Sequence, residues 1–313
     1  MPEFRNATVE VLETAVDWLR GGHIVELVTV ARTWGSSPRP LGSIAAVRDD
    51  GLLIGSVSGG CVEKQLSESF RGQHESRAHT HKVDDEEARR FGLACGGELE
   101  LVFETLTDAE PLENLLVRLA RRERVRREVR IGQRHARLHH ADRTDRLAWD
   151  GHVLHQVFGP SWRLLVVGAG QLSRFTAEFA LAIDFEVLIV EPREHFRQAW
   201  DIARVTVLAD SPDDAVLHYA NDEHSAVLAL THDPNIDDLA LLEALPGKAF
   251  YVGALGSRRS HAKRVKRLAG LDVPQEAIAR LRGPVGLPIG SRTSAEIAIS
   301  IMAELIQVRH ALN

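Results

Sequence analysis

Residues 163–173 read RLLVVGAGQLS, and this stretch decides the fold of the second half of the chain. The apolar run at its start fits a buried strand, and the glycines that follow fit a tight turn into a helix. Gly168 would make the turn and Gly170 would let a pyrophosphate approach the helix N-terminus, while Ser173 takes the place of the third glycine of the dinucleotide fingerprint. The stretch therefore predicts the opening strand, turn and helix of a nucleotide-binding fold.

The sequence that follows continues to alternate between strand and helix. The second strand ends at Glu191, where an acidic side chain could bind ribose hydroxyls. Three further strand-like runs alternate with helical segments, at residues 204–208, 226–230 and 249–252. This order predicts an α/β domain over residues 161–313, with a Rossmann-like, doubly wound sheet of five parallel strands.

Ligands of such sheets bind beyond the carboxyl ends of the strands. Ser257 and Arg258 follow the fifth strand, where they are placed to meet an anionic group. The alternative is a serine that caps a helix, followed by a solvated arginine. Further along, residues 293–296 (TSAE) have the pattern of a capping box and predict the start of an apolar final helix.

In the first half of the chain, residues 55–63 (GSVSGGCVE) place a thiol where a glycine-rich turn opens a helix. Gly59 and Gly60 form the turn, and apolar residues at helical spacing follow Cys61. Unpaired amides and the positive end of the helix dipole would stabilise a thiolate at Cys61, which makes it a candidate nucleophile or metal ligand. The alternative is a small buried residue at a tight corner.

Two more segments of the first half carry candidate contacts. The loop at residues 34–43 contains Ser36, Ser37 and Arg39, whose hydroxyls and guanidinium could hold a phosphate or similar oxyanion; an ordinary surface turn is the alternative. Cys95 precedes a Gly-Gly pair, as Cys61 follows one. The two thiols are too far apart in sequence for a CxxC redox or zinc motif.

Residues 1–110 are predicted to form a mixed α/β domain, and residues 111–160 a charged helix and strand that connect the two domains, with irregular structure over residues 134–162. Nine arginines lie between Arg118 and Arg137. Glutamates interrupt this run and it has no aromatic residues for base stacking, so a solvated face is favoured over a nucleic-acid site. The formal net charge of −6 agrees with that interpretation.

Composition predicts a globular protein of two domains, since 44% of the 313 residues are hydrophobic. Two cysteines make no disulfide framework, and the N-terminus has no pattern of signal-peptide type. No apolar run of about 18 residues is present to span a bilayer. We therefore expect a cytoplasmic protein that does not bind membranes.

Several motifs taken together resemble the XdhC/CoxI family, the xanthine dehydrogenase accessory proteins, over nearly the whole chain. The matching segments are residues 35–40, 58–63, 95–97, 167–170, 251–258, 286–290 and 296–298. Glu191 is a departure, because many members carry aspartate there.

The resemblance implies a chaperone without catalytic residues, whose cargo is the molybdenum cofactor, as molybdopterin or its cytosine dinucleotide form. Such a chaperone protects the cofactor during sulfuration and inserts it into an apo-molybdoenzyme of the xanthine dehydrogenase or aldehyde oxidoreductase type. A cysteine desulfurase, a cofactor cytidylyltransferase and a second copy of the chain in a homodimer are the further implied partners. Cys61 is the candidate molybdenum ligand, since a thiolate is a soft ligand. The expected cofactor contacts are Ser36, Ser37, Arg39, Gly59, Gly60, Cys61, Cys95, Gly168, Gly170, Glu191, Ser257 and Arg258.

Two rival functions belong to a different class. A NAD(P)-dependent oxidoreductase is suggested by the glycine turn at residues 168–170 and by Glu191. A cysteine-dependent hydrolase or sulfur transferase is suggested by Cys61, but no histidine has a spacing that identifies a base, and the G-x-S-x-G elbow is absent from the sequence.

Overall fold

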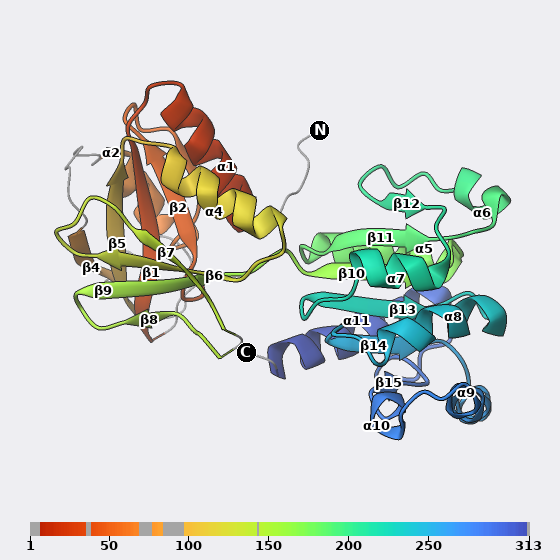
Figure 1. Cartoon of the computed structure of the whole chain (residues 1–313). Helices are drawn as coiled ribbons and strands as arrows, with labels where there is room; N and C mark the ends of the chain where they lie inside the picture. The colour runs from red at the N-terminus through yellow and green to blue at the C-terminus, as the bar shows by residue number, and fades with distance from the viewer. Residues whose placement is uncertain (1–6, 36–38, 69–76, 84–96, 143, 312–313) are drawn as a thin grey trace. The chain divides into compact units, whose positions relative to one another are not determined.

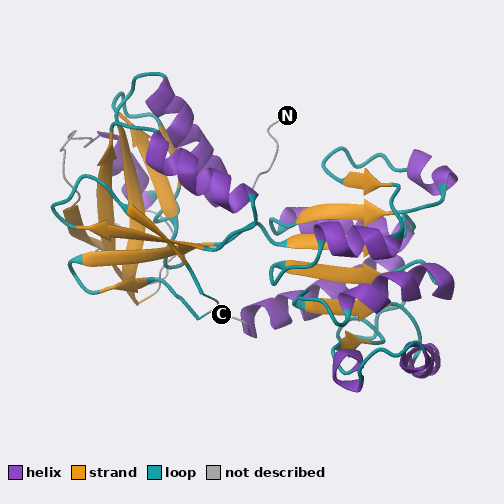
Figure 2. Ribbon diagram, in the orientation of Figure 1, coloured by secondary structure: helices purple, strands orange, loops and turns teal. Residues whose placement is uncertain are grey.

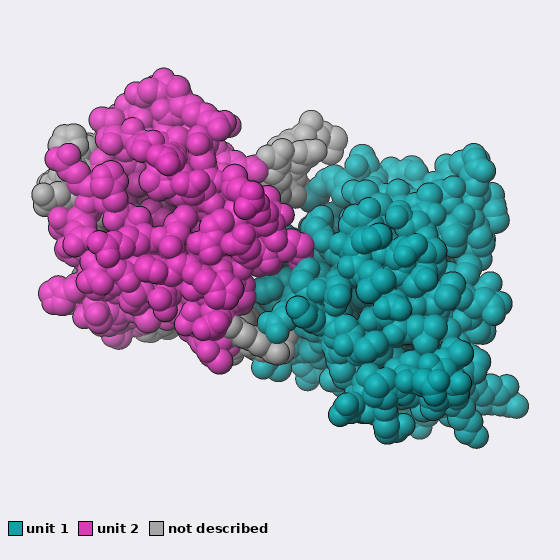
Figure 3. Space-filling view, viewed as in Figure 1, with its two compact units in different colours: residues 1–4, 161–313 teal, residues 5–160 magenta. Residues whose placement is uncertain are grey.

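The computed structural model describes residues 7–35, 39–68, 77–83, 97–142 and 144–311. The chain divides into two compact units (Figure 3), which we call the N-terminal unit (residues 5–160) and the C-terminal unit (residues 161–313, with which residues 1–4 are grouped). Each unit has its own hydrophobic core.

The N-terminal unit combines three helices with two antiparallel sheets among its described residues (Figures 1 and 2). The first sheet has the strand order β3-β2-β1-β5-β4, and the second has the order β7-β6-β9-β8. The elements are α1 (Ala7–Arg20), β1 (Val25–Gly35), β2 (Ile44–Arg48), β3 (Leu53–Gly55), α2 (Cys61–Glu68), β4 (Arg77–Val83), β5 (Gly97–Leu106), α4 (Glu110–Ala120), β6 (Val125–Arg130), β7 (Arg137–His140), β8 (Ala148–Trp149) and β9 (Val153–Phe158).

Alternation of side chains along the strands gives the first sheet two apolar faces. Leu27 belongs to the core cluster that contains α1 and α4, whereas Val28 belongs to the cluster that contains Val62 and Leu66 of α2. The helix α2, and with it Cys61, is therefore held in place by burial of its own apolar side chains against β1 and β2.

The sequence pattern predicts irregular structure in residues 134–162, but the structure has β7, β8 and β9 there. In β9 every second residue is buried, and one of the buried positions is Gln156. Its amide group donates to the Gly42 carbonyl oxygen at 3.0 Å, so it is satisfied inside the unit. A polar residue at a core position breaks the apolar alternation on which the prediction depended.

The C-terminal unit is a parallel sheet with helices on both faces (Figure 2). Its elements are β10 (Arg163–Val167), α5 (Gln171–Ala182), β11 (Glu186–Val190), α6 (Glu194–Gln198), β12 (Thr206–Leu208), α7 (Pro212–Tyr219), β13 (Ser225–Ala229), α8 (Pro234–Ala244), β14 (Tyr251–Ala254), α9 (Arg258–Gly270), α10 (Gln275–Ile278), β15 (Leu281–Arg282) and α11 (Ser294–Ala311).

The strand order β12-β11-β10-β13-β14-β15 is the 3-2-1-4-5-6 order of a Rossmann sheet, which confirms the predicted fold class. The five predicted strands are all present, and a sixth, β15, pairs with β14. The sequence did not predict β15 because a strand of two residues is too short to carry a periodic pattern.

Two apolar layers cover this sheet. Leu165 and Val167 of β10 point into the cluster formed with α7, α8 and α9, and Leu164 and Val166 point into the cluster formed with α5 and α11. The final helix α11 begins after Thr293, where the predicted capping box forms: the Glu296 carboxylate accepts from the Thr293 amide at 3.0 Å. Among the described residues, no helix combines the length and hydropathy needed to cross a bilayer.

Candidate functional sites

The turn that follows β10 lies at the switch point of the parallel sheet, where β10 is flanked by β11 and β13. Gly168 has a φ of 105°, and a Cβ at this position would lie 2.8 Å from the Thr231 Cγ2 atom. Gly170 differs, because its φ is −84° and a Cβ there would meet no atom within 4 Å. Gly168 is thus needed for the turn itself. The open space at Gly170 adjoins the α5 N-terminus, whose first amides have no intrahelical partner and can bind an anion.

Glu191 is buried directly after β11. Its carboxylate accepts from the Ala169 amide at 3.1 Å and from the Arg193 Nε and Nη2 atoms at 2.7 and 2.8 Å. Burial acts to raise the pKa of Glu191, but the hydrogen bonds from Arg193 and Ala169 outweigh it and the pKa lies below its ordinary value. A ribose hydroxyl that bound Glu191 would compete with these donors for the same two oxygen atoms.

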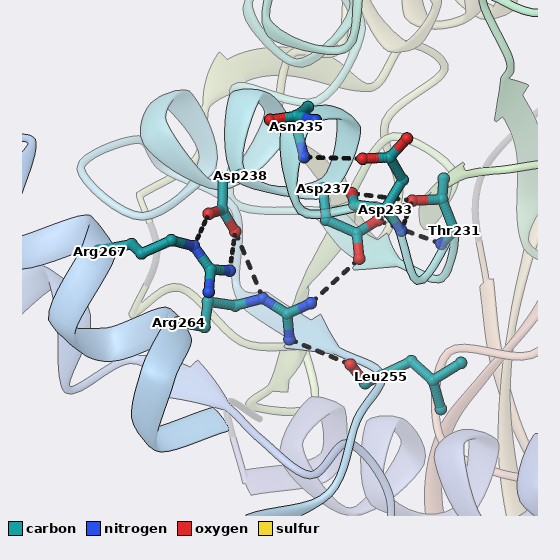
Figure 4. Close-up of polar contacts among 8 residues, drawn as sticks. All are labelled: Thr231, Asp233, Asn235, Asp237, Asp238, Leu255, Arg264 and Arg267. Carbon is teal, nitrogen blue, oxygen red and sulfur yellow. Dashed lines mark hydrogen bonds and ion pairs between the residues drawn. The ribbon is translucent and has the colours of Figure 1, made fainter. Parts of the chain in front are cut away.

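A polar network joins the loops after β13 and β14 to α8 and α9 (Figure 4). The Asp237 carboxylate accepts from the Thr231 amide at 3.1 Å and hydroxyl at 2.7 Å, and from the Arg264 Nη2 atom at 3.0 Å. Arg264 also donates to the Leu255 carbonyl oxygen at 3.0 Å. Burial raises the pKa of Asp237, and the hydrogen bonds from Thr231 oppose that shift. The network fixes Thr231, the residue that faces Gly168.

Ser257 and Arg258 lie at the start of α9. Ser257 is the N-cap of this helix, and its hydroxyl accepts from the Ser260 amide at 3.2 Å. Arg258 is exposed, and within the described chain its side chain makes no hydrogen bond or ion pair. Ser257 therefore caps the helix, and Arg258 is free to meet an anion.

In the N-terminal unit, amides and hydroxyls of the glycine-rich turn before α2 donate to one carboxylate, that of Glu63. Its Oε1 atom accepts from the amides of Val57 and Ser58, each at 2.8 Å, and from the Ser56 hydroxyl at 2.7 Å. Its Oε2 atom accepts from the Gly60 amide at 2.7 Å and from the Ser58 hydroxyl. Burial acts to raise the pKa of Glu63, but these hydrogen bonds prevail and lower it to about 2.

This arrangement changes the interpretation of Cys61, the first residue of α2. The Gly60 amide donates to Glu63, and the Val62 amide donates to the Ser58 hydroxyl at 2.8 Å. The sequence argument assigned such amides to a Cys61 thiolate, and the structure gives these two to other acceptors. The stabilisation expected from the turn is therefore reduced.

The remaining predicted contacts are divided between described and undescribed parts of the chain. Arg39 donates through Nε to the Ser56 hydroxyl at 3.1 Å, which brings its guanidinium to the same turn. Gly59 and Gly60 have φ values of 80° and 129°. Ser36, Ser37 and Cys95 lie outside the described residues. Among the described residues, no group of three or more His, Cys, Asp or Glu side chains could hold a metal ion.

The sequence patterns did not indicate two carboxylates and one arginine of these sites: Glu63, Asp237 and Arg264. A signal existed for Glu63, because a glutamate at the third helical position commonly reaches back to the N-cap amide. For Arg264 the local sequence held no signal, since its partners come from another helix and from the loop after β14.

The fold and its glycine turn define a protein in which a Rossmann-type unit is joined to an α/β unit with antiparallel sheets. Two family models match the chain: the XdhC Rossmann domain over residues 164–305, and the XdhC and CoxI family over residues 18–84. The chain belongs to the XdhC and CoxI family, as the resemblance predicted.

Individual relatives agree with this assignment. The molybdenum cofactor insertion chaperone PaoD of Escherichia coli K12 is 31% identical over 302 residues, which cover 96% of this chain and 88% of PaoD. A Bacillus subtilis protein described as a probable xanthine dehydrogenase component is 25% identical, with 90% of this chain and 92% of that protein covered. A crystal structure described as a xanthine dehydrogenase from Bacillus halodurans superposes with a TM-score of 0.73 at 24% identity, covering 97% and 96% of the two chains, and supports the fold.

Proposed function

We propose that this protein binds the molybdenum cofactor, protects it during sulfuration and delivers it to an apo-molybdoenzyme of the xanthine dehydrogenase or aldehyde oxidoreductase type. The observation that carries the proposal is the relationship to PaoD, a molybdenum cofactor insertion chaperone, over nearly the full length of both chains. The same relationship supports a role as accessory protein rather than enzyme.

The geometry of the C-terminal unit supports binding of an anionic cofactor. The open space at Gly170 adjoins the amides of the α5 N-terminus, and Arg258 is exposed beyond the end of β14, which β13 separates from β10 in the sheet. A phosphate of molybdopterin, or the pyrophosphate of its cytosine dinucleotide form, would be held by these donors. Ser257 and Glu191 would then mainly contact the protein itself. Ser257 would cap α9, and Glu191 would support the turn after β10.

The N-terminal unit holds a second set of proposed cofactor contacts. Cys61 is the proposed soft ligand, and Arg39, which donates to Ser56 of the same turn, is a proposed oxyanion contact. Gly59, Gly60, Ser36, Ser37 and Cys95 complete the set of proposed contacts. We further propose that a cysteine desulfurase takes part in the sulfuration step, that a cytidylyltransferase makes any dinucleotide cargo, and that the chain forms a homodimer.

The first test is the identity of the cargo. The protein is purified from a molybdenum-replete host, and bound molybdenum, pterin and CMP are quantified. We expect molybdenum and pterin in equal amounts, with CMP present only if the cargo is the dinucleotide form. A chain that carries neither metal nor pterin and fails to activate an apo-molybdoenzyme would refute the proposal.

Two variants assign the contacts. Gly170→Val places a side chain in the open space beside α5 and is expected to weaken cofactor binding without unfolding the sheet. Cys61→Ser keeps the size of the side chain but replaces a soft ligand with a hard one, so it is expected to lower bound molybdenum and client activation. Normal delivery by the Cys61→Ser variant would remove Cys61 from the site.

A NAD(P)-dependent oxidoreductase remains the second candidate, because the 3-2-1-4-5-6 sheet order and the Gly168 turn also suit a dinucleotide. Titration with NADH, followed by its fluorescence, separates the two functions. Tight NADH binding with turnover would favour the oxidoreductase, whereas copurified pterin without NADH binding would favour the chaperone.

A further inference from the structure

A second candidate binding site lies wholly within the N-terminal unit, away from the Cys61 turn in sequence. It is a cavity of about 240 Å³ between the segment that joins β5 to α4 and the turn that joins β6 to β7. Its wall includes Asp108, Pro111, Arg127, Arg134 and His135. Drug-sized ligands occupy pockets of roughly 300 Å³ or more, so this cavity suits a smaller molecule.

Arg127 is the unusual residue of this cavity. It lies on β6 with none of its surface exposed, and its Nη1 atom pairs with the buried carboxylate of Glu104 on β5. The Nε and Nη2 atoms of the same guanidinium find no hydrogen-bond partner among the described residues. Buried arginine donors are nearly always bonded, so this half of the guanidinium requires an acceptor.

Two buried polar side chains of the same unit do have partners. The Thr29 hydroxyl donates to the Gln156 side-chain oxygen at 3.4 Å, and the Gln156 nitrogen donates to the Gly42 carbonyl oxygen at 3.0 Å. Other buried atoms of the unit, among them the Thr105 hydroxyl of the cavity wall, find no partner among the described residues. Arg127 differs from these in having two such donors on one guanidinium, and it forms part of the cavity wall.

The geometry of a guanidinium limits which anions can bind to Arg127. The N–H groups on Nε and Nη2 are parallel and side by side, which matches two oxygen atoms of one carboxylate or phosphate. The charge of the wall distinguishes a carboxylate from a phosphate. Glu104 already neutralises Arg127, and a second carboxylate, Asp108, is in the wall. Exposed Arg134 is the additional permanent cation of the wall, which suits a single negative charge better than two.

We propose that this cavity binds a small, singly charged carboxylate, held by the Nε and Nη2 atoms of Arg127 and attracted by Arg134. The carboxylate could come from a free organic acid or from the C-terminus of a peptide, and the chemistry at Arg127 is the same for both. The proposal does not depend on cofactor binding, since it concerns other residues.

The direct test is an NMR titration of the full-length protein, following the arginine Nε–H signals at constant ionic strength. The probes are acetate, N-acetylglycine as a mimic of a peptide C-terminus, its neutral amide, and inorganic phosphate. We expect one buried arginine signal to move on addition of a carboxylate and to stay in place with the amide. Tighter binding of acetate identifies a free acid, and tighter binding of N-acetylglycine identifies a peptide terminus.

Variants locate the binding. Replacing Arg127 alone would leave Glu104 buried and unpaired, so the pair is replaced together, as Arg127→Met with Glu104→Leu, an exchange that buried ion pairs commonly tolerate. We expect the double variant to fold and to lose carboxylate binding at least tenfold, about the value of one charge-assisted hydrogen bond. Arg134→Ala should weaken binding about threefold.

The matched control is Arg137→Ala, which removes an exposed arginine of β7 that is not part of the cavity wall. It should leave the affinity unchanged. The proposal is overturned if no arginine signal responds to a carboxylate, if phosphate binds more tightly than acetate, or if the double variant binds as well as the unaltered protein.

Discussion

The two glycine-rich turns of this protein, at residues 55–63 and 168–171, have the same local design and use it differently. Each has a glycine at positive φ just before a helix. In each, a glutamate carboxylate accepts hydrogen bonds from the backbone amides of the turn. In the first turn the carboxylate belongs to Glu63 of the same helix, and it takes three amides and two hydroxyls. In the second it belongs to Glu191 of the next strand, and it takes the Ala169 amide.

The difference shows that a helix N-terminus can bind an external anion only when its amides are not already hydrogen-bonded to groups of the protein. The turn at residues 55–63 provides its own anion, so its amides serve the stability of the turn. At residues 168–171 the carboxylate binds ahead of α5, and the first amides of the helix border open space at Gly170. The second turn is thus the better candidate for a ligand phosphate.

Gly168→Ala is expected to have the largest effect on stability. A Cβ at this position would need a positive φ and would lie 2.8 Å from the Thr231 side chain, which Asp237 holds in place. We expect the C-terminal unit to lose about 3 kcal/mol, from strain and overpacking together. Hydrogen exchange of the β10 and α5 amides measures this loss, and unchanged exchange would show that the turn tolerates a side chain.

Glu63→Gln is expected to destabilise the N-terminal unit by about 2 kcal/mol, because an amide has one acceptor oxygen and its NH₂ group would oppose the donors at Gly60 or Ser58. Urea unfolding monitored by hydrogen exchange in α2 and β2 provides the measurement. Asp17→Asn, an exposed carboxylate of α1, is the matched control and should change little. Equal effects of the two substitutions would mean that the Glu63 contacts add no stability.

The Glu63 contribution should also depend on pH. Its pKa is about 2 in the folded protein, below the ordinary value of 4.5, so the unfolded chain takes up the proton first as the pH falls. The stabilisation is therefore complete above about pH 4.5 and is lost as the pH falls towards 2. We expect the stability difference between the unaltered protein and Glu63→Gln to shrink between pH 5 and pH 3, and a constant difference would contradict the assignment.

Gly170→Ala is expected to have the smallest effect on stability, within about 0.5 kcal/mol, because φ is ordinary there and the added Cβ meets no neighbour. Calorimetry of this variant beside Gly168→Ala tests whether the two glycines have separate roles. A loss as large as that of Gly168→Ala would mean that Gly170 also serves the turn.

The sequence predicted those features whose cause is local. The strands of the parallel sheet are apolar runs bounded by turns, and the capping box at Thr293 and Glu296 needs only four consecutive residues. Glu63 follows the same rule only in part: it stands at the third helical position, but its N-cap is Gly60 and the hydroxyls come from earlier in the chain, so the serine or threonine of the usual pattern is absent. The link between Asp237 and Arg264 depends on how two helices pack, which no local pattern encodes.

The packing of α11 has a consequence for synthesis of the chain on the ribosome. Ile301 and Leu305 of α11 share a core cluster with Leu172 and Ala177 of α5, the first helix of the C-terminal unit. The layer of the sheet that carries the Gly170 turn therefore stays incomplete until residues 294–311 have left the exit tunnel. The N-terminal unit, whose residues are all made earlier, can fold while the C-terminal unit is still being translated. The site at the α5 N-terminus is therefore complete only once α11 has been made, whereas every residue of the Arg127 cavity wall is made before the C-terminal unit.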